Sequence, residues 1–231
     1  MVSYSVNNLF AVIARVPSVF ADEFCWSVTI ASTSAILLTS LSVVWMWLAC
    51  GNRVARWFLL LVFAICCSLP GSLIGSSLLE LSSSTSLSLV HWLFDRTIFA
   101  PVIANSLFCF PVSVLFAWFV MQNVPRDVEE HMATEGAGPW MRLYHNVFVA
   151  QWRMLLGSLV IIFAICFGEL SASQLVVPPG MDTLPRRMLG LLHSGVNDHT
   201  AGLTIVSVSL VLVLFSIGYS FFNWNRNSMR E

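Results

Sequence analysis

Glu169 is a carboxylate within a long apolar stretch, where an ionised side chain is costly. At the middle of a bilayer a carboxylate costs about 2.5–3.5 kcal/mol on insertion scales, so it must face protein or water. Two interpretations follow. Glu169 is a pathway or gate residue that meets a cation, or it is a structural carboxylate that accepts hydrogen bonds from Ser171, Ser173 or a neighbouring backbone.

Histidine, aspartate and cysteine offer few candidate metal ligands. His193, Asp198 and His199 combine imidazole with carboxylate, but two histidines six residues apart form a weak site, and solvated loop residues are the favoured interpretation. The six cysteines contain no C-x-x-C pair and lie within or beside apolar stretches, where we expect them to be buried between helices. The sequence thus predicts neither a metal site nor a cofactor.

The sequence motifs of nucleotide-hydrolysing and proteolytic enzymes are incomplete or absent. All 11 basic residues are arginine, which excludes the lysine of a phosphate-binding loop and Schiff-base chemistry. Neither H-E-x-x-H nor G-x-S-x-G occurs, and Glu129-Glu130 matches only the start of a membrane-protease signature, E-E-x-x-x-R, because position 134 is Thr. A net charge of −1 gives no sign of nucleic-acid binding. We expect a protein that is not an enzyme and has no nucleic-acid partner.

The composition is that of a membrane protein. Of 231 residues, 57% are hydrophobic and 10% are charged, whereas soluble chains average about 25% charged residues. The mean hydropathy is +0.81. A lipid bilayer is therefore the expected environment.

Five apolar stretches are long enough to cross a bilayer as helices, which takes about 20 residues. They are residues 24–49, 57–79, 98–121, 154–177 and 201–222. We therefore predict an all-α polytopic membrane protein with about five transmembrane helices. Residues 1–23 are expected to form an interfacial or outer segment, without the pattern of a cleaved signal peptide, and residues 223–231 a cytoplasmic tail.

The placement of the arginines predicts the orientation. Seven arginines fall on one side of the five stretches and four on the other. The positive-inside rule puts the seven in the cytoplasm, with the N-terminus outside and the C-terminus inside. In the outer loop of residues 178–200, prolines end a helix, and Met188, Leu191 and Leu192 then follow at helical spacing. This pattern favours a short amphipathic helix on the outer surface.

Residues 123–153 hold the densest charge in the chain and predict a short cytoplasmic helix. Pro125 stands where a helix begins, and three of the next five residues are carboxylates, which favour the positive end of the helix dipole. Gly136 and Pro139 then end the helix. The predicted helix has about ten residues and is roughly 15 Å long. A helix of this kind is suited to inserting into a groove on another protein.

Within this segment, Glu130 is followed by Gly136 six residues later. This spacing resembles the EAA loop of type I ABC importer permeases, in which a Glu-Ala-Ala triplet is followed by a Gly at the same distance. Further matches, to the branch of ferric-iron permeases, lie in residues 69–71, 167–173, 178–184 and 191–195. The similarity covers about residues 24–222. Over this range the chain resembles the C-terminal half of a fused double permease, without the first helix of that half.

The resemblance implies a permease subunit of a binding-protein-dependent importer in the bacterial inner membrane. Two permease halves, as a homodimer or heterodimer, would form the pathway, and a periplasmic substrate-binding protein would deliver the substrate. Two ABC ATPase subunits would hydrolyse ATP and bind the short cytoplasmic helices. Glu130, Ala133 and Gly136 would form the coupling contact, with Glu130 as an acidic edge and Gly136 as a close turn. The implied substrate is ferric iron, with thiamine or another small ion as the alternative.

The sequence departs from the family pattern at two places. His131 and Met132 replace the two alanines of the triplet, and the proline expected shortly before the fourth span is missing, with Val149 or Ala150 near its place. Because small residues let the coupling helix pack closely in its groove, these larger side chains count against tight docking and leave an alternative open. That alternative is a degenerate or structural membrane subunit without transport activity. An ordinary solvated loop, which also collects charge, is the other interpretation of this segment.

Overall fold

The structure is a computed structural model that describes residues 19–84, 88–124, 126–194 and 198–228. The described residues are 85% helical and contain no strand, which confirms the prediction of an all-α protein. The helices are α2 (Ala21–Gly51), α3 (Arg53–Ser68), α4 (Gly71–Ser84), α5 (Ser88–Arg96), α6 (Phe99–Gln122), α7 (Arg126–Thr134), α8 (Pro139–Leu143), the π-helix η1 (Tyr144–Val149), α9 (Trp152–Gly168), α10 (Leu184–Ser194) and α11 (Asp198–Ser228).

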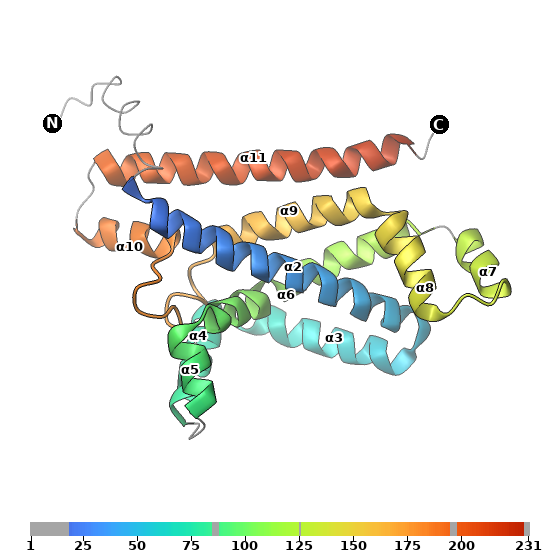
Figure 1. Cartoon of the computed structure of the whole chain (residues 1–231), viewed down its shortest axis with the longest axis horizontal. Helices are drawn as coiled ribbons and strands as arrows, with labels where there is room; N and C mark the ends of the chain where they lie inside the picture. Colours follow the sequence, from blue (N-terminus) through green and yellow to red (C-terminus); the bar gives the residue numbers. More distant parts are fainter. Residues whose placement is uncertain (1–18, 85–87, 125, 195–197, 229–231) are drawn as a thin grey trace.

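The longer helices run side by side along one axis (Figure 1). In the described part of the chain, three helices are long and apolar enough to cross a membrane, namely α2, α6 and the stretch Ala201–Asn223 of α11. Two bent pairs, α3 with α4 and α8–η1 with α9, raise the number to five if each pair is one span. Both views show α7 beyond one end of the bundle and α10 near the other. We call these the α7 end and the α10 end.

The second predicted span, residues 57–79, is not one continuous helix. It breaks at Leu69-Pro70, and the axes of α3 and α4 differ by 102°. Pro70 has no amide hydrogen and disfavours helical backbone at Leu69, which is extended at φ −86° and ψ 119°. As a result, α4 and α5 project sideways from the bundle (Figure 1).

The fourth predicted helix, residues 154–177, ends earlier than expected. Helix α9 stops at Gly168, and Glu169 has extended backbone at φ −75° and ψ 130°. Residues 171–176 then form turns. Glu169 is therefore not inside a helix, as the sequence had suggested, but begins the loop that follows one.

Small and hydroxyl-bearing residues allow the helices of the core to approach closely. Ser42 of α2 and Ser113 of α6 are both buried, with their hydroxyl oxygens 2.6 Å apart. Helices α9 and α11 meet at Gly157 and Gly218, where a Cβ added to Gly157 would lie 3.0 Å from the carbonyl oxygen of Gly218. Small residues are the usual means of close helix packing in membranes, where burial of apolar surface gives no driving force between helices.

The predicted terminal segments overlap with helices. Residues 1–18 of the expected N-terminal segment lie outside the described residues, and Ala21 to Glu23 already belong to α2. At the other terminus α11 continues through Ser228, past the predicted boundary at residue 222. The cysteines are less buried than expected, because only Cys109 and Cys166 are buried and Cys66 is partly buried.

Candidate functional site

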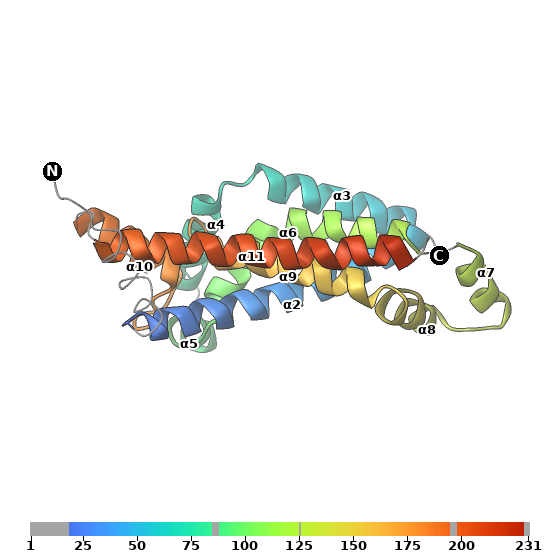
Figure 2. The same cartoon turned by 90° about the horizontal axis from the view of Figure 1, so that it is seen from above.

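Helix α7 projects beyond the α7 end of the bundle (Figure 2). The helix ends in a Schellman cap at Gly136. This glycine has φ +79°, in the left-handed region that glycine adopts readily. The amide of Ala137 donates to the carbonyl of Met132 at 3.0 Å, which is the long bond of a Schellman cap. No side chain would clash at Gly136, since an added Cβ would meet nothing within 4 Å. The glycine is needed for its backbone conformation and not for space.

The three predicted coupling residues all lie on α7 or its cap. Glu130 is exposed, Ala133 lies one helical turn later in α7, and Gly136 forms the turn that ends the helix. The side chain of Ala133 is outside the described part. His131, in place of the first alanine of the family triplet, is exposed, whereas Met132 is partly buried. The structure thus brings the predicted residues together on one short element.

A bent segment joins α7 to the fourth span. α8 and the π-helix η1 precede α9 and are bent from it by 73°. The sequence lacks the proline that the resemblance led us to expect here, and the bend follows instead a π-helix that includes Val149. A π-helix carries one extra residue per turn, so it shifts the direction in which the following helix leaves.

A side chain that the sequence analysis did not single out fixes this bend. The Nε2 of Gln151, which is buried, donates to the carbonyl oxygen of Asn123 at 2.9 Å. Asn123 is the C-cap of α6, so this bond joins the two ends of the segment that carries α7. The bond connects the end of α6 to the start of α9, so the segment that carries α7 is attached to both helices.

Glu169 is bonded to its own loop. Its Oε1 accepts from the Ser171 hydroxyl at 2.7 Å and from the Ala172 amide at 2.8 Å, and its Oε2 accepts from the Ser173 amide at 3.3 Å. The residue is 7% exposed. This geometry fits the structural-carboxylate interpretation, since the carboxylate satisfies amides that turns would leave unpaired.

The loop that Glu169 holds packs tightly against α4. A Cβ added to Gly75 would lie 2.6 Å from the carbonyl oxygen of Ala172, and one added to Gly71 would collide with Ser171. Ala172 is fully buried in a small apolar cluster with Ile74. The broken span and the loop after α9 therefore form one packed unit at the α10 end.

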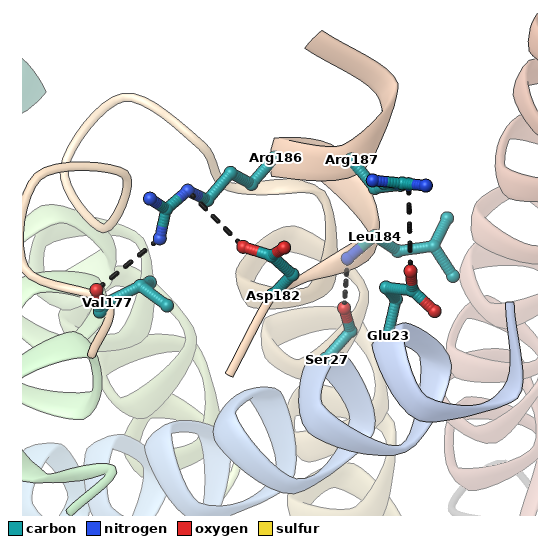
Figure 3. Close-up of polar contacts among 7 residues, drawn as sticks. All are labelled: Glu23, Ser27, Val177, Asp182, Leu184, Arg186 and Arg187. Carbon is teal, nitrogen blue, oxygen red and sulfur yellow. Dashed lines mark hydrogen bonds and ion pairs between the residues drawn. The ribbon is translucent and has the colours of Figure 1, made fainter. Parts of the chain in front are cut away.

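Polar contacts also attach α10 to α2 (Figure 3). The buried amide of Leu184 donates to the Ser27 hydroxyl at 2.7 Å, and Arg187 lies 3.7 Å from Glu23. Arg186 lies 3.6 Å from Asp182 and donates to the Val177 carbonyl at 3.4 Å. The ion pairs are largely exposed, and such pairs contribute roughly 0–1 kcal/mol, so the buried Leu184–Ser27 bond is the main polar attachment.

The possible metal ligands His193, Asp198 and His199 lie at or near α10, and no further ligand from the described residues is grouped with them. The Nδ1 of His193 lies 2.8 Å from the Leu189 carbonyl oxygen of its own helix. The side chains of Asp198 and His199 lie outside the described part of the chain. Among the described residues, no three histidine, cysteine or acidic side chains are grouped to hold a metal ion.

Comparison with known proteins gives relatives of one kind. No family model matches the chain. The chain is 29% identical over 203 residues to the putative 2-aminoethylphosphonate transport system permease protein PhnV of Salmonella typhimurium, and equally so to that of Salmonella choleraesuis. The match covers 82% of this chain and 72% of each relative. The similarity supports a permease of an ABC transport system in general terms, and it gives no support to the ferric-iron branch or to half of a fused permease.

Proposed function

We propose that this chain is the permease subunit of an ABC importer and that α7 is the helix gripped by the ATPase. The observation that carries the proposal is the short α7, which lies beyond the bundle, ends at Gly136 and contains Glu130 at the family spacing from that glycine. The similarity to transport-system permeases supports it. On this proposal the α7 end faces the cytoplasm and the α10 end faces the outside of the bacterial inner membrane.

The geometry suggests how motion of the ATPase reaches the spans. Because the cap ends α7 sharply, the helix can be displaced as a short rod. Glu130 would provide an acidic edge, Ala133 a small contact surface and Gly136 a close turn. The bond from Gln151 to Asn123 would pass the displacement to α6 and α9 together. Pairs of spans would then rock between outward-facing and inward-facing states.

Glu169 is proposed to act at the outer gate by positioning the loop that follows α9, residues 171–176. Its carboxylate accepts hydrogen bonds from amides in the turns of residues 171–176, and this loop packs on α4. Movement of α9 would therefore carry the loop and α4 with it. A Glu169→Gln variant tests the negative charge alone, because glutamine has nearly the same size as glutamate and keeps one acceptor oxygen. Uptake at the normal rate in that variant would remove any role of the negative charge.

The substrate that we propose is a small phosphonate of the 2-aminoethylphosphonate type, because the similar Salmonella permeases are named for the transport of that compound. Ferric iron is not proposed, since no relative supports it. The partners would be an ABC ATPase, a second permease half and a periplasmic binding protein for the phosphonate. The chain would form the pathway and hydrolyse no nucleotide itself.

Co-purification combined with uptake tests the proposal. The tagged chain is isolated from its own membranes, co-purified ATPase is quantified, and cellular uptake of labelled 2-aminoethylphosphonate is measured. Gly136→Val forces a branched side chain into the left-handed region and should abolish both. Gly180→Val is the matched control, because Gly180 also has positive φ, +87°, and an open Cβ position but lies near the α10 end. Absence of any ATPase from the wild-type complex would contradict the proposal.

A further inference from the structure

A groove of about 770 Å³ with charged and aromatic side chains in its lining lies at the α7 end. It is lined by the end of α2, the start of α3, the end of α6, and by α7 and α8. Its charged lining residues in the described part are Arg56, Arg142 and Glu129, and Trp47 and Trp118 add aromatic surface. Two guanidinium groups against one carboxylate leave the groove with a positive charge, which suits an anion.

Arg56 and Arg142 both have N–H donors that the hydrogen bonds of the described residues leave unused. The Nε of Arg142 is buried and makes no hydrogen bond among the described residues. Arg56 donates from Nε and Nη2 to the carbonyl oxygens of Ala49 and Cys50, at 3.3 and 3.4 Å, which caps α2. These bonds leave Nη1 of Arg56 for another acceptor. Arginine with several N–H donors is well suited to phosphate oxygens.

A second, apolar groove of about 410 Å³ adjoins the first. The two share Cys50, Arg56 and Trp118, and the second continues between α2, α3 and α6 with Leu60 and Phe63 among its lining. The pair thus has a polar part with cations and an apolar part that runs along helices expected to lie in hydrocarbon. Such a shape matches a molecule with a charged head and an apolar chain.

We propose that an anionic glycerophospholipid binds here, with its phosphate at Arg56 and Arg142 and an acyl chain in the apolar groove. A small water-soluble phosphonate would use the arginines but leave the apolar groove unfilled. Bulk lipid of any headgroup would fill the apolar groove but leave the arginines without a charged partner. The proposal requires a membrane-embedded chain, and it does not require that the chain transports anything.

Native mass spectrometry of the purified chain, titrated with phosphatidylglycerol and with phosphatidylcholine, tests the headgroup. One arginine near a membrane surface contributes about 1 kcal/mol toward an anionic lipid, or roughly a fivefold change in affinity. Arg142→Gln should therefore lower phosphatidylglycerol binding about fivefold, and Arg142→Lys should keep most of it. Arg186→Gln, at the α10 end and far from the groove, is the control and should leave the binding of both lipids unchanged.

Two adjacent leucines of α3 test the chain-binding part. Leu60 lines the apolar groove, whereas Leu61 is 59% exposed and does not. Leu60→Trp should fill the groove and lower binding of both lipids, while Leu61→Trp should not. Equal affinity for the two lipids in the wild type, or loss of binding in Arg186→Gln, would overturn the proposal. So would displacement of phosphatidylglycerol by free 2-aminoethylphosphonate, which would assign the arginines to a soluble anion.

Discussion

The two ends of the molecule use polar residues in opposite ways. At the α10 end, Glu169 and Arg186 bond to loop backbone, and Ser27 of α2 accepts from the amide of Leu184 at the start of α10. At the α7 end, Glu130 and His131 are exposed on a helix that projects beyond the bundle. Both ends contain a glycine with positive φ, so the difference does not come from the turns.

This difference suggests a division of roles. Buried hydrogen bonds at the α10 end contribute to the folded state, so changes there should lower stability. The exposed charges of α7 contribute little to folding, so changes to these side chains should affect partner binding alone. The experiments below test whether stability and partner binding separate between the two ends in this way.

The largest loss of stability is expected for Glu169→Ala. It removes the acceptor of two backbone amides and a hydroxyl at a buried position, which should cost about 3 kcal/mol. The measurement is thermal unfolding of the purified chain. Glu80→Ala, at an exposed carboxylate on α4, is the control and should unfold as the wild type does. Equal unfolding of the two variants would mean that the hydrogen bonds of Glu169 do not stabilise the loop.

Gly75→Ala should come next in size. Its Cβ would lie 2.6 Å from the Ala172 carbonyl oxygen, so α4 and the loop after α9 must move apart, at a cost of about 2 kcal/mol. Gly190→Ala, also within a helix, meets nothing within 4 Å and should be neutral or slightly stabilising. The comparison is read from the unfolding temperatures of both variants. Similar values for the two would show that α4 does not rest on the loop.

Ser27→Ala should have a smaller effect, about 1 kcal/mol, because it leaves the buried amide of Leu184 without its acceptor. Ser40→Ala on the same helix is the matched control, since the Ser40 hydroxyl is exposed and bonds the Ile36 carbonyl of its own helix. Protease sensitivity of the α9–α10 loop reports the detachment of α10. If the two serine variants are cleaved alike, the Ser27 bond does not hold α10.

Glu130→Gln should leave the unfolding temperature unchanged, because the Glu130 side chain is exposed. An exposed carboxylate in an ion pair with a partner contributes roughly 0.2–1 kcal/mol, so ATPase binding should weaken up to about fivefold. Glu135→Gln, at another exposed acidic residue beyond the last turn of α7, is the comparison variant. A lower unfolding temperature for Glu130→Gln would show that exposed side chains of α7 also stabilise the fold, which would contradict the difference drawn between the two ends.

The sequence predicts the helical class and the position of α7 because both depend on local signals. Apolar length gives the spans, and the glycine after a charged run gives the helix end. The breaks at Pro70 and Gly168 were missed, although Pro70 is visible in the sequence, because hydropathy measures apolar content and not backbone continuity. The early end of α9 depends on Glu169 capturing amides of the next residues, which an apolar average cannot show.

The remaining features depend on contacts between distant residues. Gln151 bonds to Asn123 across 28 positions, and Arg56 and Arg142 line one groove although 86 positions separate them. No local pattern marks such residues, since each one reads as a single polar side chain near the end of an apolar stretch. Only the packing of α2, α6 and the bent segment before α9 brings them together.

The most direct test of the central proposal is the accessibility of α7. In a background in which the native cysteines are replaced by alanine, Glu130→Cys and Asp182→Cys are labelled with a membrane-impermeant maleimide in intact cells and in inverted vesicles. The proposal predicts that the α7 position reacts only in inverted vesicles, and is protected when the ATPase is bound, whereas the Asp182 position reacts only from outside. Labelling of the Glu130 position in intact cells would contradict the proposal that α7 couples to a cytoplasmic ATPase.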